Sequence, residues 1–193
     1  EESIGFKINY RKLLEYLKNK HKVSKAFYYS GVRIYDFEYS ILDYKPIDFD
    51  KAVLYLKDLQ KKSDPKEAAV IEKSLSKINF YKLLESIGYT MKIKPAKVLY
   101  SIDDNGEEQE ILKANCDVDM TYDMMRLMPQ YSGVVAMTGD GDFVSVLNYL
   151  KMHDRKVTVI SRADRTAKEL KDLAESNFVD FSKLKKVIEY FKK

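Results

Sequence analysis

The sequence is poor in the residues that form disulfides and zinc centres. Its 193 residues include a single cysteine, Cys116, and two histidines, His21 and His153, which lie far apart along the chain. One cysteine cannot form an internal disulfide, and a zinc centre draws on several cysteine or histidine ligands. Any metal chemistry therefore falls to carboxylates, which favour a hard cation such as Mg²⁺ or Mn²⁺.

Long apolar runs and a strong excess of one charge are also missing. No stretch approaches the roughly 20 apolar residues of a membrane span, and nothing resembles a signal peptide, so we expect a cytoplasmic protein with no membrane partner. The 34 lysines and arginines outnumber the 30 acids by only four, which excludes a strongly basic DNA-coating protein. With 45% hydrophobic residues, the chain can fold as one domain with a sizeable core, or as one domain carrying an insertion.

The second half of the chain alternates regularly between strand and helix patterns. Apolar runs predict strands at 133–137, 156–160 and 178–181. Amphipathic stretches predict helices at 118–128, 143–152, 166–176 and from Ser182 onward. Short joints between such elements favour a parallel sheet covered by helices on both faces, and thus an α/β fold.

The first half mixes longer helices with short strands. Helices are predicted at 7–20, 48–62 and 64–87, and strands at 25–32, 89–93 and 97–102, with an irregular stretch at 35–46 and a turn at 103–106. Asn9 is expected to cap the first helix, Asp64 and Pro65 to begin the third, and Gly88 to end it.

The most specific pattern is an acidic turn that directly follows the strand predicted at 133–137. In Thr138-Gly-Asp-Gly-Asp142 the two glycines permit tight turning and close backbone approach. Asp140 and Asp142 then lie at the carboxyl end of a parallel strand, where open α/β sheets place their sites. A helix cap would explain Asp140 alone. Two acids so close repel each other unless a cation or a shared proton intervenes, so we interpret them as a functional centre.

A second acidic group surrounds the start of the helix predicted at 118–128. Asp117 can cap that helix, and we favour it as a metal ligand together with Asp140 and Asp142. Asp119 and Asp123 share a helix face. A solvated surface and a part in the site explain these two acids equally well.

Another family pattern overlaps this region. Asp117-Val-Asp-Met-Thr121 matches the DxDxT nucleophile motif of haloacid-dehalogenase-like phosphatases. That motif follows an apolar strand, whereas the residues before Asp117 do not form a strand pattern. The interval before Thr138 also leaves no room for that fold's intervening units, so the phosphatase is the less favoured alternative.

Three segments together resemble the NYN domain family, the LabA-like branch of the PIN-like nuclease superfamily. They are KANCDVDMTYDMM at 113–125, VVAMTGDGDFVSVLNYLKMHDRKVTVIS at 134–161 and TAKELKDLAESNFVDF at 166–181. The resemblance implies one Rossmann-like (PIN-like) domain over residues 1–193, with Mg²⁺ or Mn²⁺ bound by Asp117, Asp140 and Asp142. It implies a ribonuclease that hydrolyses RNA, with Lys113, Thr138 and Asp123 in support.

Cationic residues follow the acidic turn in the sequence and are candidates for contacts with single-stranded RNA. They are Arg155, Lys156, Arg162, Arg165 and Lys168. Simple surface solvation explains them equally well. Tyr28 and Tyr29 are candidates for base stacking, with core packing as the alternative.

Two features depart from the family pattern. The family opens with an apolar strand ending in D-x-x-N, and the sequence begins after the place where that strand would stand, so we expect a preceding segment. The second departure is a helical insertion at 48–78, which we interpret as a packing cap, with a dimer surface or a nucleic-acid lid as alternatives. A homo-oligomer is compatible with this pattern. A non-catalytic RNA- or protein-binding module on the same fold is the alternative to the nuclease.

Overall fold

The computed structural model describes residues 5–40, 42, 45–102 and 108–190. The chain divides into two compact units. Unit 1 combines Glu1–Ser24 with Asp117–Lys193, and unit 2 comprises Lys25–Cys116. In the part of the chain that is described, no helix combines the length and the apolar character needed to cross a membrane.

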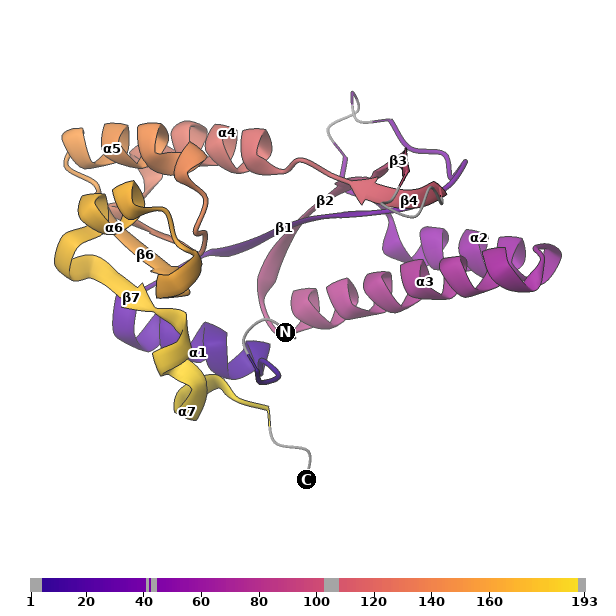
Figure 1. The fold of residues 1–193 in the computed structure, drawn as a ribbon, viewed down its shortest axis with the longest axis horizontal. Coiled ribbons are helices and arrows are strands. Elements are labelled where there is room, and N and C mark those ends of the chain that lie inside the picture. The colour runs from indigo at the N-terminus through magenta and orange to yellow at the C-terminus, as the bar shows by residue number, and fades with distance from the viewer. Residues whose placement is uncertain (1–4, 41, 43–44, 103–107, 191–193) are drawn as a thin grey trace. The chain divides into compact units, whose positions relative to one another are not determined.

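Unit 1 is built around a three-stranded parallel sheet in the order β5-β6-β7 (Figure 1). Its strands are β5 (Gly133–Ala136), β6 (Lys156–Ser161) and β7 (Phe178–Asp180). Its α-helices are α1 (Tyr10–His21), α4 (Asp117–Leu127), α5 (Val144–Met152), α6 (Lys168–Ala174) and α7 (Lys185–Ile188). The sheet pairs Val134 with Val157 and Val159 with Phe178.

Alternate residues of each strand in unit 1 enter different cores, because successive strand side chains point to opposite faces of a sheet. On β6, Val157 and Val159 pack with residues of α4, α5 and α6. Ile160 packs instead with residues of α1 and α7. Both faces of this sheet are therefore covered by helices, and this confirms the α/β fold expected from the strand and helix pattern.

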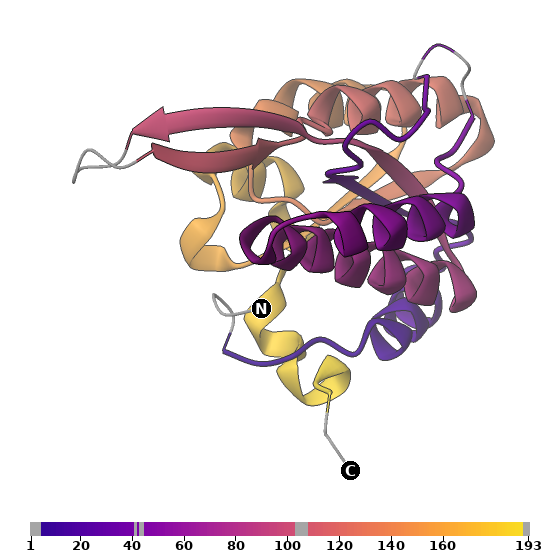
Figure 2. The ribbon, with the colours of Figure 1, turned by 90° about the vertical axis from the view of Figure 1, so that its right-hand side faces the viewer.

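Unit 2 contains a second parallel pair of strands, and its two longest helices lie side by side (Figure 2). The strands β1 (Ala26–Val32) and β2 (Tyr89–Pro95) pair in parallel, and β3 (Lys97–Ile102) and β4 (Glu108–Lys113) form an antiparallel pair. The helices are α2 (Phe49–Lys62) and α3 (Pro65–Ser86). The expected insertion at 48–78 thus becomes α2 and most of α3. Its residues Ala52, Leu56 and Ile71 are fully buried, so this segment supplies much of the core of unit 2.

The helix starts follow the local sequence signals. The side chains of Asn9 and Asp48 accept hydrogen bonds from backbone N–H groups three residues later. Asp64 accepts from the N–H groups of Lys66 and Glu67, and Pro65 opens α3. Gly88 has a φ of 106° just after that helix, as expected for a glycine at a helix end.

Several expectations differ from the structure. β4 was not expected, because Glu108–Lys113 mixes charged with apolar residues and lacks a strict alternation. The helix expected at 166–176 is shortened to α6 with a 3₁₀ turn at Glu175–Asn177. The C-terminal helix is only the four residues of α7. The turn expected at 103–106 lies outside the described residues.

Tyr81 is the largest fully buried side chain, and its hydroxyl group is satisfied inside unit 2. The Tyr81 hydroxyl lies 2.8 Å from Ser30 Oγ and donates to the Gly31 carbonyl oxygen at 3.0 Å. Burial raises the pKa of Tyr81 to about 12. The hydroxyl therefore ties α3 to β1 in its neutral form.

We expect Tyr81→Phe to lower the free energy of unfolding by about 1–2 kcal/mol at pH 7, because both partners lose a hydrogen bond in a buried place. The raised pKa has a consequence for pH. The contribution of Tyr81 is fully present below its unfolded pKa of about 10 and is lost as the pH rises towards its folded pKa. Urea denaturation of both proteins between pH 7 and pH 12 measures this. An identical decline of stability at high pH in wild type and variant would contradict the assignment.

Candidate functional site

The acidic turn lies at the carboxyl end of β5, as the sequence predicted. The Asp140 backbone N–H donates to Thr138 Oγ1 at 3.1 Å, and the Asp142 N–H donates to Asp140 Oδ1 at 3.0 Å. Asp140 caps the 3₁₀ turn Gly141–Phe143 that leads into α5. Both aspartates are exposed, while Phe143 is buried beneath them. The turn thus presents two carboxylates to solvent, and one oxygen of Asp140 is already used to shape it.

Gly139 and Gly141 are required for space rather than for an unusual backbone conformation. A Cβ on Gly139 would lie 2.8 Å from the Arg165 carbonyl oxygen and 2.8 Å from Ser161 Oγ. A Cβ on Gly141 would lie 3.3 Å from Ala167 Cβ. Among the described glycines, the positive φ angles belong to Gly5 and Gly88. The close backbone approach predicted from the sequence is confirmed.

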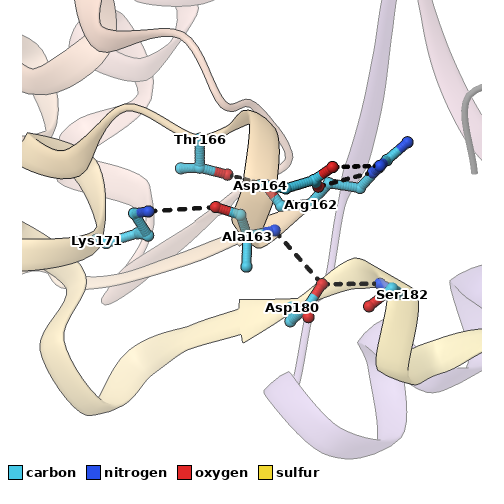
Figure 3. A network of polar contacts seen from close by, with 7 residues as sticks. All are labelled: Arg162, Ala163, Asp164, Thr166, Lys171, Asp180 and Ser182. Carbon is cyan, nitrogen blue, oxygen red and sulfur yellow. Dashed lines mark hydrogen bonds and ion pairs between the residues drawn. The ribbon is translucent and has the colours of Figure 1, made fainter.

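The loop that packs behind the acidic turn is held by its own polar contacts (Figure 3). This buttress loop, Arg162–Ala167, follows β6 directly. Its Ala167 N–H donates to the Gly139 carbonyl oxygen at 2.9 Å. Thr166 Oγ1 donates to the Arg162 carbonyl oxygen, and Lys171 Nζ donates to the Ala163 carbonyl oxygen at 3.2 Å.

Asp180, at the end of β7, fixes the other side of the buttress loop (Figure 3). Its Oδ1 accepts from the Ser182 N–H at 3.0 Å and from the Ala163 N–H at 3.5 Å. Burial alone would raise the pKa of Asp180, but the hydrogen bonds from Ser182 and Ala163 outweigh it and leave that pKa below the ordinary value. The ionised carboxylate is therefore the form that holds the loop.

The acids of the second acidic group differ in their burial. Asp117 is the first residue of α4, Asp119 follows two residues later, and both are half-buried. A carboxylate at this end of a helix interacts favourably with the helix dipole. Asp123 is only 5% exposed. The Arg126 guanidinium holds Asp123, with Nη2 2.5 Å from Oδ1, so this carboxylate has a clear structural partner.

The basic candidates fall into three groups. Arg165 and Lys168 are exposed and lie in and just after the buttress loop, next to the residues that contact Gly139 and Gly141. Arg162 forms a two-point ion pair with Asp164, which leaves its charge largely neutralised.

Arg155 and Lys156 belong to the other end of the sheet. Arg155 Nε donates to the Met128 carbonyl oxygen at 3.1 Å. Lys156 is the first residue of β6, so it lies at the end of the strand opposite the acidic turn. The structure therefore brings Arg165 and Lys168, but not Lys156, to the carboxyl edge of the sheet.

Three of the other candidates lie in unit 2. Lys113 is the exposed last residue of β4. Tyr28 packs on the rings of Phe80 and Tyr81, with ring centroids 6.0 and 6.1 Å apart. This is the core-packing alternative considered for Tyr28. The ring centroid of Tyr29 lies 6.3 Å from that of Phe27.

A bound metal ion would need several ligating side chains that lie close together. Within residues 5–40, 42, 45–102 and 108–190, no three histidine, cysteine, aspartate or glutamate side chains are placed to hold one ion. Asp117, Asp140 and Asp142 therefore do not form a three-ligand site in this arrangement. The turn and the buttress loop nevertheless define an acidic edge on a parallel sheet, flanked by cationic side chains.

Comparison with known proteins identifies the class of this arrangement. The family model of the NYN domain matches residues 32–185. The chain therefore belongs to the NYN domain family, part of the PIN-like nuclease superfamily, which indicates a nuclease- or RNA-related function. This membership also decides between the two motifs that overlap at Asp117–Thr121, against the phosphatase.

Two individual proteins are similar to this chain. The low amplitude and bright protein LabA of Synechococcus elongatus is 30% identical over 110 residues, which is 57% of this chain and 58% of LabA. The match thus spans somewhat more than half of that relative. A crystal structure of a protein of unknown function from Vibrio parahaemolyticus has a TM-score of 0.53 at 19% identity, covering 93% of this chain and 82% of the other. This likeness shows the shared fold.

Sequence reasoning missed Ser161, Asp180 and the supporting role of Thr166. Thr166 and Asp180 act through backbone groups of the buttress loop, and Ser161 meets the turn only because Gly139 lacks a side chain. Ser161 directly follows the strand expected at 156–160, and Asp180 lies near the end of the strand expected at 178–181. That position is the signal that could have found these two residues, since strand ends gather at one edge of a parallel sheet. Thr166 opens the helix expected at 166–176 and has no such signal.

We expect Gly139→Ala to lower the free energy of unfolding by about 1–3 kcal/mol, because the added methyl group overlaps backbone and Ser161 Oγ. Gly141→Ala is the matched control, with a smaller loss, since its Cβ meets only another methyl group at 3.3 Å. Urea denaturation measures both. Equal losses in the two variants would contradict the close approach at Gly139.

Proposed function

We propose that this chain is a ribonuclease that hydrolyses phosphodiester bonds of single-stranded RNA at the acidic turn Thr138–Asp142. The observation that carries the proposal is the position of Asp140 and Asp142. Both are exposed at the carboxyl end of a parallel strand, and the turn is backed by a loop that carries cations. Membership of the NYN domain family supports the same reaction class.

The side chains of this edge suit the needs of hydrolysis. The attacking water must lose a proton, and the phosphoryl oxygens gain negative charge in the transition state. An exposed carboxylate of Asp140 or Asp142 accepts the proton. Thr138 accepts a hydrogen bond from Asp140 and keeps its own hydroxyl proton to donate to phosphate. Arg165 and Lys168 supply positive charge beside the turn.

Bound Mg²⁺ or Mn²⁺ is a separate expectation within this proposal. The described carboxylates do not form a three-ligand site, so no step of the mechanism is assigned to a metal ion. The requirement for a divalent cation is instead measured by comparing cleavage with Mg²⁺ and with EDTA.

A non-catalytic RNA-binding module is the second candidate. Two of the acids have structural roles that favour this candidate: Asp140 caps a turn, and Asp123 forms an ion pair with Arg126. Both candidates use the same cationic edge. They differ in whether the charge of Asp140 is needed for chemistry.

Asp140→Asn separates the two candidates. Asparagine caps helices and turns as well as aspartate does, so the variant should fold normally, while removal of a proton acceptor should slow cleavage by at least about a hundredfold. Asp172→Asn makes the same change at an exposed acid of α6 that is not part of the acidic turn; it is the control and should retain full activity. The readout is cleavage of labelled single-stranded RNA with Mg²⁺ and with EDTA. Intact RNA that the wild type binds but does not cut would favour the binding module.

Removing the cations beside the turn should weaken RNA binding. For Arg165→Gln with Lys168→Gln, the slope of log affinity against log salt should fall by about 0.7 for each charge removed, because each phosphate contact releases counterions. Lys156→Gln removes one positive charge at the opposite end of β6 and should change the slope little. Fluorescence anisotropy of labelled RNA, measured between about 50 and 300 mM salt, gives this slope. If Lys156→Gln lowered the slope by the same amount per charge, the RNA would not be bound specifically beside the acidic turn.

A further inference from the structure

The outer face of α4 carries a row of exposed apolar side chains. Val118, Tyr122 and Met125 are 73%, 61% and 37% exposed. They are spaced four and three residues apart, so they line one side of the helix. Met124, on the opposite side, is buried in the core of unit 1. Scattered exposed apolar residues are ordinary, but an aligned row indicates an interaction surface. We call these three residues the α4 ridge.

Opposite charges border the α4 ridge on one flank. Asp119 and Arg126 are seven residues apart, which is two helical turns, so both lie along the same side of the ridge. The guanidinium carbon of Arg126 lies 5.6 Å from the centre of the Tyr122 ring. The Arg126 side chain is 43% exposed even while it pairs with Asp123. The ridge therefore has an acid near its N-terminal end and a base near its C-terminal end.

We propose that the α4 ridge binds the α4 ridge of a second copy of this chain in an antiparallel, two-fold dimer. Antiparallel pairing centred on Tyr122 sets Val118 of one copy against Met125 of the other and brings the two Tyr122 rings together. The same pairing sets Asp119 of each copy beside Arg126 of the other. A two-fold contact must use one patch that complements itself, and this flank does so in charge. A parallel two-fold arrangement would instead place each Asp119 on the flank away from the Arg126 side chains of the other copy, so this charge pairing would be lost.

The size of the ridge sets the strength of the dimer. α4 has 11 residues, which span about 16 Å at the usual helical rise. A contact of one short helix falls at the small end of specific interfaces, so the dimer dissociates at roughly micromolar to tens of micromolar concentrations.

Sedimentation equilibrium of the whole chain at about 1 to 300 μM, in 50 mM and 1 M salt, measures this association across the expected range. The wild type should shift from monomer to dimer. Tyr122→Lys, which places a charge at the centre of the apolar contact, should leave a monomer throughout. Leu54→Lys makes the same kind of change at a residue that is 70% exposed on α2 and should leave the dimer unchanged.

The charge pattern is tested by a second matched pair. Asp119→Lys sets like charges together twice in the dimer and should raise its dissociation constant about tenfold or more at low salt. Glu169→Lys changes the net charge equally on α6 and should have little effect. The difference between these variants should shrink in 1 M salt, where the screening length is about 3 Å. Circular dichroism confirms that each variant is folded.

A wild-type chain that stays monomeric up to 300 μM would overturn the proposal, and so would a dimer that survives Tyr122→Lys in a folded variant. Equal weakening by Leu54→Lys or by Glu169→Lys would overturn it too, because the association would then not depend on the α4 ridge. The proposal would also be overturned if the chain stayed monomeric and its α4 ridge bound a different protein. None of these results depends on nuclease activity.

Discussion

The candidate site depends on the close approach of Gly139 to the buttress loop. A Cβ atom at position 139 would lie 2.8 Å from both Ser161 Oγ and the Arg165 carbonyl oxygen, so the acidic turn and the buttress loop leave no room for a side chain there. The backbone hydrogen bond from Ala167 to Gly139 then ties the turn to the loop. This contact sets the turn that carries Asp140 against the loop that carries Arg165 and leads into Lys168, the first residue of α6. Any larger residue at position 139 would separate the acids from the cations.

Periodicity and local signals were enough to predict the architecture of unit 1. Three apolar runs were predicted to be strands, and each forms a strand of the parallel sheet. They contain Val134, Val157 and Phe178. The position of the acidic turn was predicted as well, because Thr138–Asp142 directly follows an apolar run that forms β5. β4 could not be predicted in the same way. Glu110, Ile111, Leu112 and Lys113 are exposed, and the sequence of the strand is mixed in character. Its pairing with β3 rests on backbone hydrogen bonds that leave no trace in the side-chain pattern.

The site illustrates why an acidic motif alone does not determine its chemistry. A carboxylate at a helix start has two uses, as a cap and as a reactive group, and the two draw on the same oxygens. Asp140 uses Oδ1 to cap the turn, and the residue is exposed to solvent. Asp123 is different, because burial makes its ion pair with Arg126 a condition of folding. Sequence spacing treats these acids alike, and only burial separates them.

The geometry of α4 allows one short helix to serve several purposes. With 3.6 residues per turn, a helix presents separate faces to separate surroundings. Met124 and Asp123 face the core, Asp117 and Asp119 occupy the positive end of the helix dipole, and the α4 ridge faces away from the sheet. The charges at the two ends then perform two tasks at once. They stabilise the helix through its dipole, and they give the ridge a direction, because a second α4 ridge would bring its Arg126 beside Asp119 only when it runs the opposite way.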